Sequence, residues 1–363
     1  MKAAVCYEYG APLSVEDVEI AAPQKGEVKV RVAVTAICHS DVHLIRGEWG
    51  GRPPTVAGHE TAGIVEEVGE DVAQVHPGDR VIVSLLRACG RCFYCVTGLP
   101  NLCEGAFPLE RGSRLRNQRG ESLRHGFGTA TFAEYAIVDQ SQVVRLPDDI
   151  PLDRAALLAC GVITGVGAAV NTAQVRPGTT VVVIGTGGVG LNAVQGARLA
   201  GATQIVAVDL LDAKLATARV FGATHTINAG SADAPRAVRD LTSGRGADYA
   251  LVTVASAPAV EQGLAMLRPA GTLVIVGLPS RSATAAIPIF QLVAKGQHIL
   301  GSNMGSTRLS VDVPWLVDLY RQGRLKLDEL ITARYPLDQI NEAIAKMEAG
   351  EALRNVIMFE AGA

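Results

Sequence analysis

The stretch from Val181 to Asp209 restricts the fold of this chain more than any other. It begins with an apolar, β-branched run, continues through the glycine-rich turn GTGGVG at residues 185–190, and ends in a second apolar run that closes on Asp209. The segment between the two runs is expected to be a helix that stops at Gly201. Strand, glycine-rich turn, helix, strand and acid in this order are typical of the βαβ unit that binds a dinucleotide.

Physical chemistry gives the residues of this unit separate tasks. Gly185 permits the tight turn, Gly187 lets the backbone approach a pyrophosphate, and Gly190 lets helix and strand pack closely. Asp209 stands 19 residues beyond Gly190, where an acid can accept hydrogen bonds from the adenosine ribose. The alternative is a glycine turn that serves packing alone. The predicted dinucleotide contacts are Gly185, Gly187, Gly188, Val189, Gly190 and Asp209.

Composition predicts a cytoplasmic globular protein of about two domains. The 363 residues are 48% hydrophobic and 19% charged. A net charge of −3 provides no basic field for nucleic acid or a membrane surface. No apolar run reaches the ~18 residues of a membrane span, and no signal peptide is recognised. The seven cysteines therefore need a role other than disulfides.

Four of the cysteines predict a structural zinc site. They follow the spacing C-x2-C-x2-C-x7-C, which supplies four thiolates from one loop and leaves no position for a substrate. An iron–sulfur cluster is the alternative. The predicted ligands are Cys89, Cys92, Cys95 and Cys103, whereas Cys6 is expected to be a buried structural thiol.

A second ligand set is scattered along the chain. Cys38 follows one strand-like run, His59 precedes another, and Cys160 follows a short helical segment. Together they would form the Cys₂His set of a catalytic zinc site, which keeps one coordination position open. Spacing alone cannot bring such distant residues together, and each of them also has an ordinary structural explanation.

The periodicity of the chain changes near residue 180. The first 150 residues contain short β-type runs between glycines and prolines, which predicts a compact antiparallel, barrel-like domain. Residues 178–302 alternate between strands and helices, which predicts a doubly wound sheet of six parallel strands. The tail is expected to form helices at 314–322 and 337–347 and a last strand at 356–359.

In their order and separations, these motifs resemble those of the zinc-dependent alcohol dehydrogenases of the medium-chain dehydrogenase/reductase superfamily. The resemblance covers essentially the whole chain. Its carriers are the segment CHSDVH at 38–43, Gly58-His59-Glu60, the four-cysteine loop, Ala159-Cys160-Gly161 with Thr164-Gly165, and the glycine turn with Asp209. The resemblance implies a mostly-β, GroES-like catalytic domain, residues 1–162 and 302–363. A Rossmann domain, residues 163–301, would be inserted in it, with the active site in the cleft between them.

The resemblance also implies roles for individual residues. Cys38, His59 and Cys160 become the catalytic zinc ligands, and Asp41 and Glu60 support His59 and tune the metal. Ser40 and His43 relay the alcohol's proton to water, unless His43 is simply a surface histidine. The implied cofactor contacts outside the glycine turn are His39 and Arg354 at the pyrophosphate, Thr164, and Lys214 near the ribose.

The implied activity is hydride transfer between an alcohol and NAD(H), giving an aldehyde or ketone, with two Zn²⁺ per chain and a homodimer or homotetramer. Asp209 would repel the 2′-phosphate of NADP, and Leu210 and Leu211 offer no cation, although Lys214 lies just beyond them. Oxidation of a thiol adduct of formaldehyde is an alternative substrate class. A non-catalytic, zinc-stabilised binding protein and a zinc-free quinone or enoyl reductase are further alternatives, but the latter enzymes lack the Cys/His/Cys set.

An arginine-rich loop precedes a strand that is expected at 131–135. Its basic residues are Arg111, Arg114, Arg116, Arg119 and Arg124, with His125 beside them. Three interpretations are open: a solvated loop whose charges meet nearby acids, a funnel for an anionic substrate, and a subunit interface.

Overall fold

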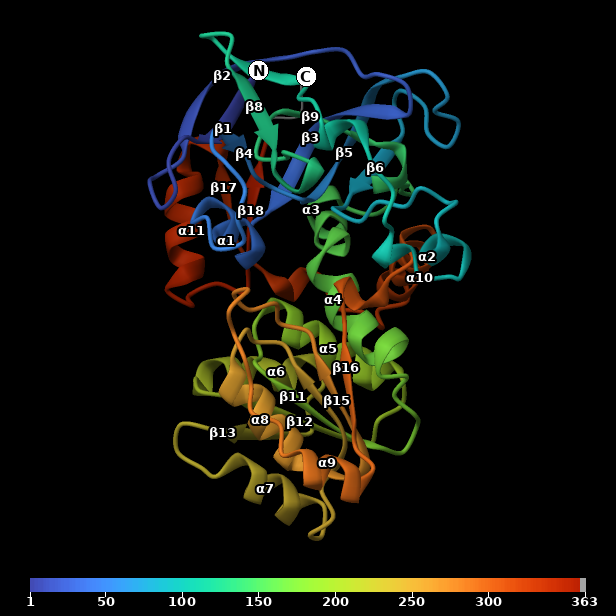
Figure 1. The fold of residues 1–363 in the computed structure, drawn as a ribbon, viewed down its shortest axis with the longest axis vertical. Coiled ribbons are helices and arrows are strands. Elements are labelled where there is room, and N and C mark those ends of the chain that lie inside the picture. Colours follow the sequence, from blue (N-terminus) through green and yellow to red (C-terminus); the bar gives the residue numbers. More distant parts are fainter. Residues whose placement is uncertain (360–363) are drawn as a thin grey trace. The chain divides into compact units, whose positions relative to one another are not determined.

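The computed structural model describes residues 1–359 and divides into two compact units. One comprises residues 1–160 together with the chain from 308 onward, and the other comprises residues 161–307. Figure 1 shows both units and labels most of their helices and strands. The predicted domain limits, at 162/163 and 301/302, differ from these limits by a few residues and stay predictions.

The second unit contains the predicted parallel sheet of six strands, in the order β13-β12-β11-β14-β15-β16. Every neighbouring pair of these strands is parallel. The strands are β11 (Thr180–Ile184), β12 (Gln204–Asp209), β13 (His225–Asn228), β14 (Ala247–Val252), β15 (Leu267–Ile275) and β16 (His298–Gly301). Its helices are α4 (Gly161–Gly167), α5 (Gly188–Leu199), α6 (Asp212–Phe221), α7 (Ala234–Leu241), α8 (Ala257–Met266) and α9 (Ile289–Lys295). The short helical segments η6 (Ala168–Thr172) and η7 (Met304–Ser306) complete the unit.

Burial along β11 explains why this sheet is parallel. Its residues Val181 to Ile184 are all buried, although successive side chains of a strand point to opposite faces. Both faces of the sheet are therefore covered, which crossover helices achieve and a half-solvated antiparallel sheet does not. The apolar run that marks the strand in the sequence thus reflects burial on two sides.

The first unit combines a closed barrel with a seven-stranded sheet. The barrel runs β1-β2-β7-β8-β4, with β1 (Lys2–Cys6), β2 (Ser14–Ile20), β4 (Thr55–Val56), β7 (Leu115–Asn117) and β8 (Ser122–His125). The sheet runs β10-β6-β5-β3-β18-β17, with β9 paired to β3. Its strands are β3 (Glu27–Ala36), β5 (Glu60–Val68), β6 (Arg80–Val83), β9 (Tyr135–Asp139), β10 (Val143–Arg145), β17 (Ile331–Pro336) and β18 (Arg354–Met358). Pairing is antiparallel except at β4–β8 and β17–β18, so the predicted barrel-like domain is confirmed.

The C-terminal tail belongs to this first unit. Strand β18 pairs antiparallel with β3, so the end of the chain extends a sheet that its beginning started. Helix α11 (Ile340–Glu348) contributes Ile340, Ile344 and Met347 to the barrel core around Phe132. The other helices of the unit are α1 (His39–Ile45), α2 (Phe93–Val96), α3 (Leu152–Ala156) and α10 (Leu309–Arg321).

Three element predictions differ from the structure. The strand expected at 131–135 begins only at Tyr135, because Ala130 has φ +57° and Ala133 forms only an isolated bridge with Ala3. Helix α10 starts at Leu309 and includes Pro314 in its interior, whereas the prediction placed the start at Pro314. Strand β17 was missed, because its half-buried, polar-rich sequence lacks an apolar run.

Among the described residues, no single helix is long and apolar enough to span a membrane. One broken pair, 152–159 with 161–172, meets the length and composition criteria only when its two parts are taken together.

Candidate active site

The first unit brings together the three scattered ligands predicted for a catalytic metal. Cys38 immediately precedes α1, His59 lies between β4 and β5, and Cys160 follows the short helical segment η5 (Leu157–Ala159). Their ligand atoms, together with a carboxylate oxygen of Glu60, all lie within 4.8 Å of one another. All four residues are buried. Elements far apart in the sequence thus build one compact group, which we call the Cys₂His group, with Glu60 as its fourth member.

Asp41 fixes the geometry of the Cys₂His group through hydrogen bonds to the backbone and to His59. One of its carboxylate oxygens accepts a hydrogen bond from the Cys38 backbone N–H at 3.0 Å. The other accepts from the Gly58 N–H at 2.9 Å and lies 3.0 Å from Nδ1 of His59. A carboxylate can only accept, so Nδ1 carries the proton and Nε2 is left to bind a metal. These contacts support the predicted role of Asp41 in orienting His59.

The electrostatics of the group suit a cation. A hydrogen bond from the Cys160 thiol is the main reason why the pKa of Cys38 lies well below its usual value, and the same contact raises the pKa of Cys160. Burial alone would lower the pKa of His59, but the Asp41 carboxylate raises it well above the usual value. Cys160 and His59 thus hold protons that a bound metal ion would displace, whereas Cys38 gives up its proton more readily. Two thiolates and one imidazole are the donor set that Zn²⁺ takes in catalytic sites, so the residues fit the predicted metal.

Glu60 and Arg354 form an ion pair at the edge of this group. Their closest oxygen and nitrogen atoms are 3.5 Å apart, and both side chains are at least 95% buried. Burial works against the charge of Arg354, yet Glu60 and Cys38 keep its pKa above the usual value. The Nη2 atom of Arg354 has no hydrogen-bond partner among the described residues, which leaves a donor for an anion. The predicted contact between Arg354 and a pyrophosphate is compatible with this free donor and stays a prediction.

Aromatic side chains extend from the Cys₂His group toward His43. The ring of Phe127 packs edge-on against His59 at 4.7 Å between centroids, and Trp49 packs edge-on against Phe127 at 6.4 Å. Trp49 in turn stacks on His43 at 4.8 Å. Phe127 adopts φ +57°, an uncommon conformation for a bulky side chain. Neither Phe127 nor Trp49 was predicted, because nothing in the local sequence indicates that Phe127 contacts His59, 68 residues earlier, or that Trp49 contacts Phe127.

The remaining predicted residues of α1 have different environments. His39 is exposed at the first position of the helix, and Ser40 is half-buried next to it. His43 is half-buried and lies 2.5 Å from a carboxylate oxygen of Glu48.

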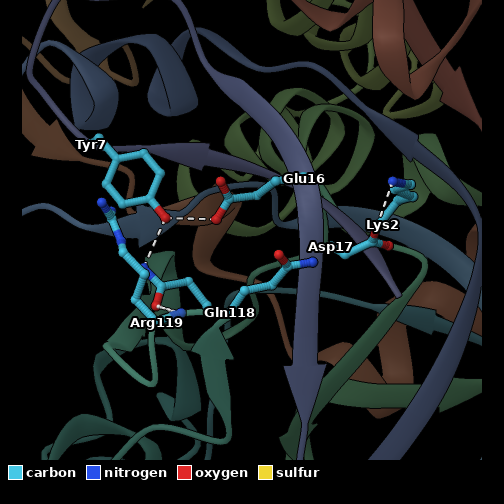
Figure 2. A pocket seen from close by; sticks show the side chains of 7 residues that line it. Lys2, Tyr7, Glu16, Asp17, Gln118 and Arg119 are labelled. Carbon is cyan, nitrogen blue, oxygen red and sulfur yellow. Dashed lines mark hydrogen bonds and ion pairs between the residues drawn. The ribbon is translucent and has the colours of Figure 1, made fainter.

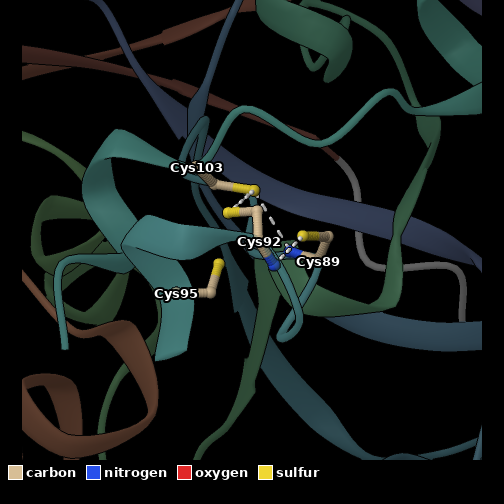
Figure 3. Close-up of side chains that lie close together, drawn as sticks. All are labelled: Cys89, Cys92, Cys95 and Cys103. Atoms are coloured by element: carbon tan, nitrogen blue, oxygen red, sulfur yellow. Dashed lines mark hydrogen bonds between the residues drawn. The ribbon is translucent and has the colours of Figure 1, made fainter. Parts of the chain in front are cut away.

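The four cysteines of the second predicted metal site also come together. Their sulfur atoms lie within 4.8 Å of one another. Figure 3 shows the four side chains close together. Backbone N–H groups donate to these sulfurs, from Cys92 to Cys89 and from Cys89 and Gly105 to Cys103. Backbone hydrogen bonds lower the pKa of Cys92 to about 6, whereas burial raises that of Cys95 to about 12. Four free thiols with this geometry match a closed tetrahedral zinc site.

The dinucleotide motif of the second unit forms the predicted turn. Gly185 has φ +87°, and a Cβ on Gly190 would lie 1.8 Å from the Gly185 carbonyl oxygen, so both positions require glycine. A Cβ on Gly187 would meet nothing within 4 Å, so open space lies beside the start of α5, where Gly188 and Val189 form the first turn. Free space at a helix N-terminus is what a pyrophosphate needs.

Asp209, at the end of β12, already faces this turn. One carboxylate oxygen accepts hydrogen bonds from the Thr186 N–H at 2.7 Å and its hydroxyl at 2.9 Å. The other accepts from the N–H groups of Leu210 and Leu211. Leu210 and Leu211 are exposed, and Lys214 is half-buried on α6. Thr164 lies in α4, where its hydroxyl contacts the sulfur of Met304 at 3.6 Å.

The arginine-rich loop contains residues with different environments, and Arg114 is not a solvated one. Its guanidinium makes two hydrogen bonds to Glu27, at 2.7 and 2.9 Å, and both side chains are buried. Arg116 binds the Gly120 carbonyl of its own turn. Arg119 lies over the ring of Tyr7 at the edge of a surface hollow of about 420 Å³, shown in Figure 2. These contacts favour a structural explanation over an anion funnel.

Comparison with known proteins follows the same division of the chain. Residues 24–148 match the family model described as alcohol dehydrogenase GroES-like domain, and residues 188–322 match that of zinc-binding dehydrogenase. The class-3 alcohol dehydrogenase of Myxine glutinosa is 39% identical and covers 99% of this chain and 97% of its own. The NDMA-dependent alcohol dehydrogenase of Amycolatopsis methanolica is also 39% identical and covers 99% of both chains.

Among solved structures, the benzyl alcohol dehydrogenase of Acinetobacter calcoaceticus has a TM-score of 0.92 and is 33% identical. The match covers 99% of both chains.

Proposed function

Because this chain belongs to the zinc-dependent alcohol dehydrogenases of the medium-chain family, we propose that it oxidises uncharged aromatic alcohols to aldehydes with NAD⁺. The proposal includes two zinc ions per chain, one in the Cys₂His group and one in the four-cysteine site. The observation that carries it is the convergence of Cys38, His59 and Cys160, fixed from behind by Asp41.

The residues around the Cys₂His group would divide the work of catalysis. When bound, zinc would supply a Lewis acid that makes the substrate hydroxyl more acidic, and a nicotinamide would supply a hydride acceptor. Asp41 accepts a hydrogen bond from the proton carried by Nδ1 of His59 and so would orient the ring with Nε2 as the metal-binding nitrogen. Ser40 and His43, on successive turns of α1, would move the released proton away from the substrate.

The aromatic side chains support the substrate class. Phe127 packs against His59 of the Cys₂His group, and Trp49 packs against Phe127 and His43, so aromatic rings connect the group to His43. Aromatic rings pack favourably edge-on or offset against another ring. The structural relative that acts on benzyl alcohol by name agrees with this choice. The alternative substrate, a thiol adduct of formaldehyde, would favour a cationic entrance, but Arg114 and Arg119 are already occupied by other contacts.

The environment of Asp209 supports NAD(H) over NADP(H). Its carboxylate stands at the end of β12 beside the glycine turn, where a 2′-phosphate would meet a negative charge. The exposed Leu210 and Leu211 bring no compensating cation to that position. Lys214 is the nearest cation along the chain and lies one helical turn further.

An exposed sheet edge supports the proposed homodimer. Strand β16 ends the parallel sheet, and Leu300 on it is 39% exposed. Ile289, Phe290 and Val293 on α9 are each more than 70% exposed. An unpaired edge together with a large apolar surface is typical of a subunit interface. We propose that a second copy of the chain covers this surface.

A substrate screen that follows NADH absorbance tests the proposal. Benzyl alcohol, a short aliphatic alcohol and formaldehyde with added thiol would each be offered with NAD⁺ and with NADP⁺. The expected result is the highest kcat/KM with benzyl alcohol and NAD⁺. A higher kcat/KM with the formaldehyde–thiol adduct would show that the adduct, and not an aromatic alcohol, is the preferred substrate. If no alcohol led to reduction of NAD⁺ or NADP⁺, the proposed activity would be wrong.

A further inference from the structure

His43 is held from two sides by adjacent residues of the loop that follows α1. A carboxylate oxygen of Glu48 lies 2.5 Å from Nδ1, and the indole of Trp49 stacks on the ring face at 4.8 Å between centroids and 24° between planes. The imidazole is 25% exposed and the Glu48 side chain 38% exposed. Neither Glu48 nor Trp49 belongs to the motifs that the sequence analysis recognised.

The backbone places Glu48 where it can make this contact. After α1 ends, the Arg46 and Gly47 N–H groups donate to the carbonyls of Val42 and Leu44, and the Glu48 N–H donates to the His43 carbonyl at 3.0 Å. Gly47 has φ +74°, and a Cβ there would lie 2.7 Å from the Tyr9 ring. The turn therefore packs closely on Tyr9, and its shape directs the side chain of Glu48 toward the imidazole of His43.

The contact determines which imidazole nitrogen carries the proton. An ionised carboxylate has no hydrogen to donate, so the Glu48–Nδ1 hydrogen bond requires a proton on Nδ1. In the neutral ring, Nε2 is then the acceptor. Without Glu48, both tautomers would be populated and the ring could rotate about its side-chain bonds.

We propose that Glu48 is a positioning residue for His43, holding the imidazole in the tautomer whose Nε2 can accept the proton released by the substrate. The inference rests on the proposed function, in which His43 is the exit of the proton relay. Nε2 accepts the proton and the ring becomes an imidazolium, with its Nδ1–H still bonded to Glu48. The same proton then leaves Nε2 for water, so the residue returns to its starting state. Glu48 keeps its charge throughout and touches no reacting atom.

The first test is the tautomer itself. Nitrogen NMR of selectively ¹⁵N-histidine-labelled protein, with the His43 signals assigned from a His43→Asn variant, distinguishes protonated from unprotonated ring nitrogens. At a pH where His43 is neutral, we expect the Nδ1–H form in the wild type and a mixture of both tautomers in Glu48→Ala. Glu48→Gln should keep the wild-type signals, because its amide oxygen still accepts from Nδ1. Equal spectra for the wild type and Glu48→Ala would overturn the proposal.

The second test is kinetic and uses the alcohol that the wild type oxidises fastest. Glu48→Ala should lower kcat about tenfold, a fraction of the ~10²–10⁴-fold that general acid–base catalysis contributes. KM and zinc content should stay unchanged, the solvent isotope effect on kcat should increase, and added imidazole should restore part of the rate. Glu48→Gln should recover most of kcat.

The control is Glu19→Ala, which removes an exposed glutamate of β2 in the same unit and should change nothing. A Glu48→Ala variant with wild-type kcat and isotope effect would contradict the positioning role while the proposed function stood. If the wild type reduced NAD⁺ with none of the alcohols tested, the proposed function would be wrong. The catalytic part of the positioning role would then be wrong as well, and the NMR experiment would decide only whether Glu48 fixes the tautomer.

Discussion

At the scale of single residues, burial decides what Arg114 does. In the sequence, Arg114 is one of several arginines in a loop. In the structure, its guanidinium donates two hydrogen bonds to Glu27 and a third, at 2.8 Å, to Gln24. Removing one partner of a buried pair leaves an uncompensated charge. This arginine therefore serves the stability of the first unit.

We expect Arg114→Ala to lower the free energy of unfolding by ~3–5 kcal/mol. The measurement is urea unfolding followed by circular dichroism. Arg116→Ala is the matched control, because Arg116 is exposed and bonds only to the Gly120 carbonyl, so a change within ~0.5 kcal/mol is expected. A stable Arg114→Ala variant with a raised KM for anionic substrates alone would revive the anion funnel.

His125, beside Arg114, makes stability depend on pH. Burial, helped by the charge of Arg114, lowers the pKa of His125 to about 4, against ~6.5 for an unfolded histidine. The unfolded chain therefore binds a proton between pH ~6.5 and ~4 that the folded chain does not, so stability is complete above this window and is lost as the pH falls through it. Protonation would also break the hydrogen bond that Nε2 accepts from the Arg114 N–H at 3.1 Å.

Unfolding experiments at pH 7 and pH 5 should show this loss. The wild type should lose ~1–2 kcal/mol more than His125→Gln over the interval. An equal loss in both proteins would assign the acid sensitivity to other groups.

At the scale of elements, the turn between β11 and α5 depends on Asp209 for both shape and charge. Asp209→Asn keeps an oxygen that can accept from Thr186 but removes the negative charge. We expect the ratio of kcat/KM for NAD⁺ over NADP⁺ to fall at least severalfold in this variant, since a 2′-phosphate would no longer be repelled. A wild type that prefers NADP⁺ would refute the cofactor assignment outright.

The four-cysteine loop is the element that a metal would order. Cys103 accepts hydrogen bonds from the N–H groups of Cys89 and Gly105, so its sulfur connects the two ends of the loop. Cys103→Ala should lose about one zinc per chain, and its soluble yield should fall. Cys6→Ala is the control, because Cys6 is a buried thiol in β1 outside both metal groups. Unchanged zinc content in Cys103→Ala would contradict the structural site.

Elements with a strong local pattern were predicted correctly from the sequence. The apolar run at 181–184 and the glycine turn specify β11 and the start of α5, because both depend on neighbours in the chain. The closure of the barrel was not predictable in detail. It needs β4, only two residues long, to pair with β1 and β8, and no periodicity can appear in two residues. The same limit applies to Phe127 and Trp49, because only the fold brings Phe127 to His59 and Trp49 to Phe127.

At the scale of the whole molecule, the assembly prediction depends on one surface. Phe290, 85% exposed on α9, should lie within the interface of the proposed homodimer. Phe290→Asp should shift the protein toward monomer in analytical ultracentrifugation, because a buried unpaired charge is costly. Phe93→Asp, which changes a residue 66% exposed on α2, serves as the control. A wild-type monomer would contradict the homodimer.

We propose that two metal groups with different purposes coexist in one chain, and zinc analysis combined with turnover measurements can tell them apart. The wild type should contain about two zinc ions per chain. Cys160→Ala should remain folded, keep about one zinc ion in the four-cysteine site, and lose alcohol-dependent NADH formation, because the Cys₂His group would lack a thiolate. A Cys160→Ala variant that oxidises alcohol at the wild-type rate would contradict the catalytic role of the Cys₂His group.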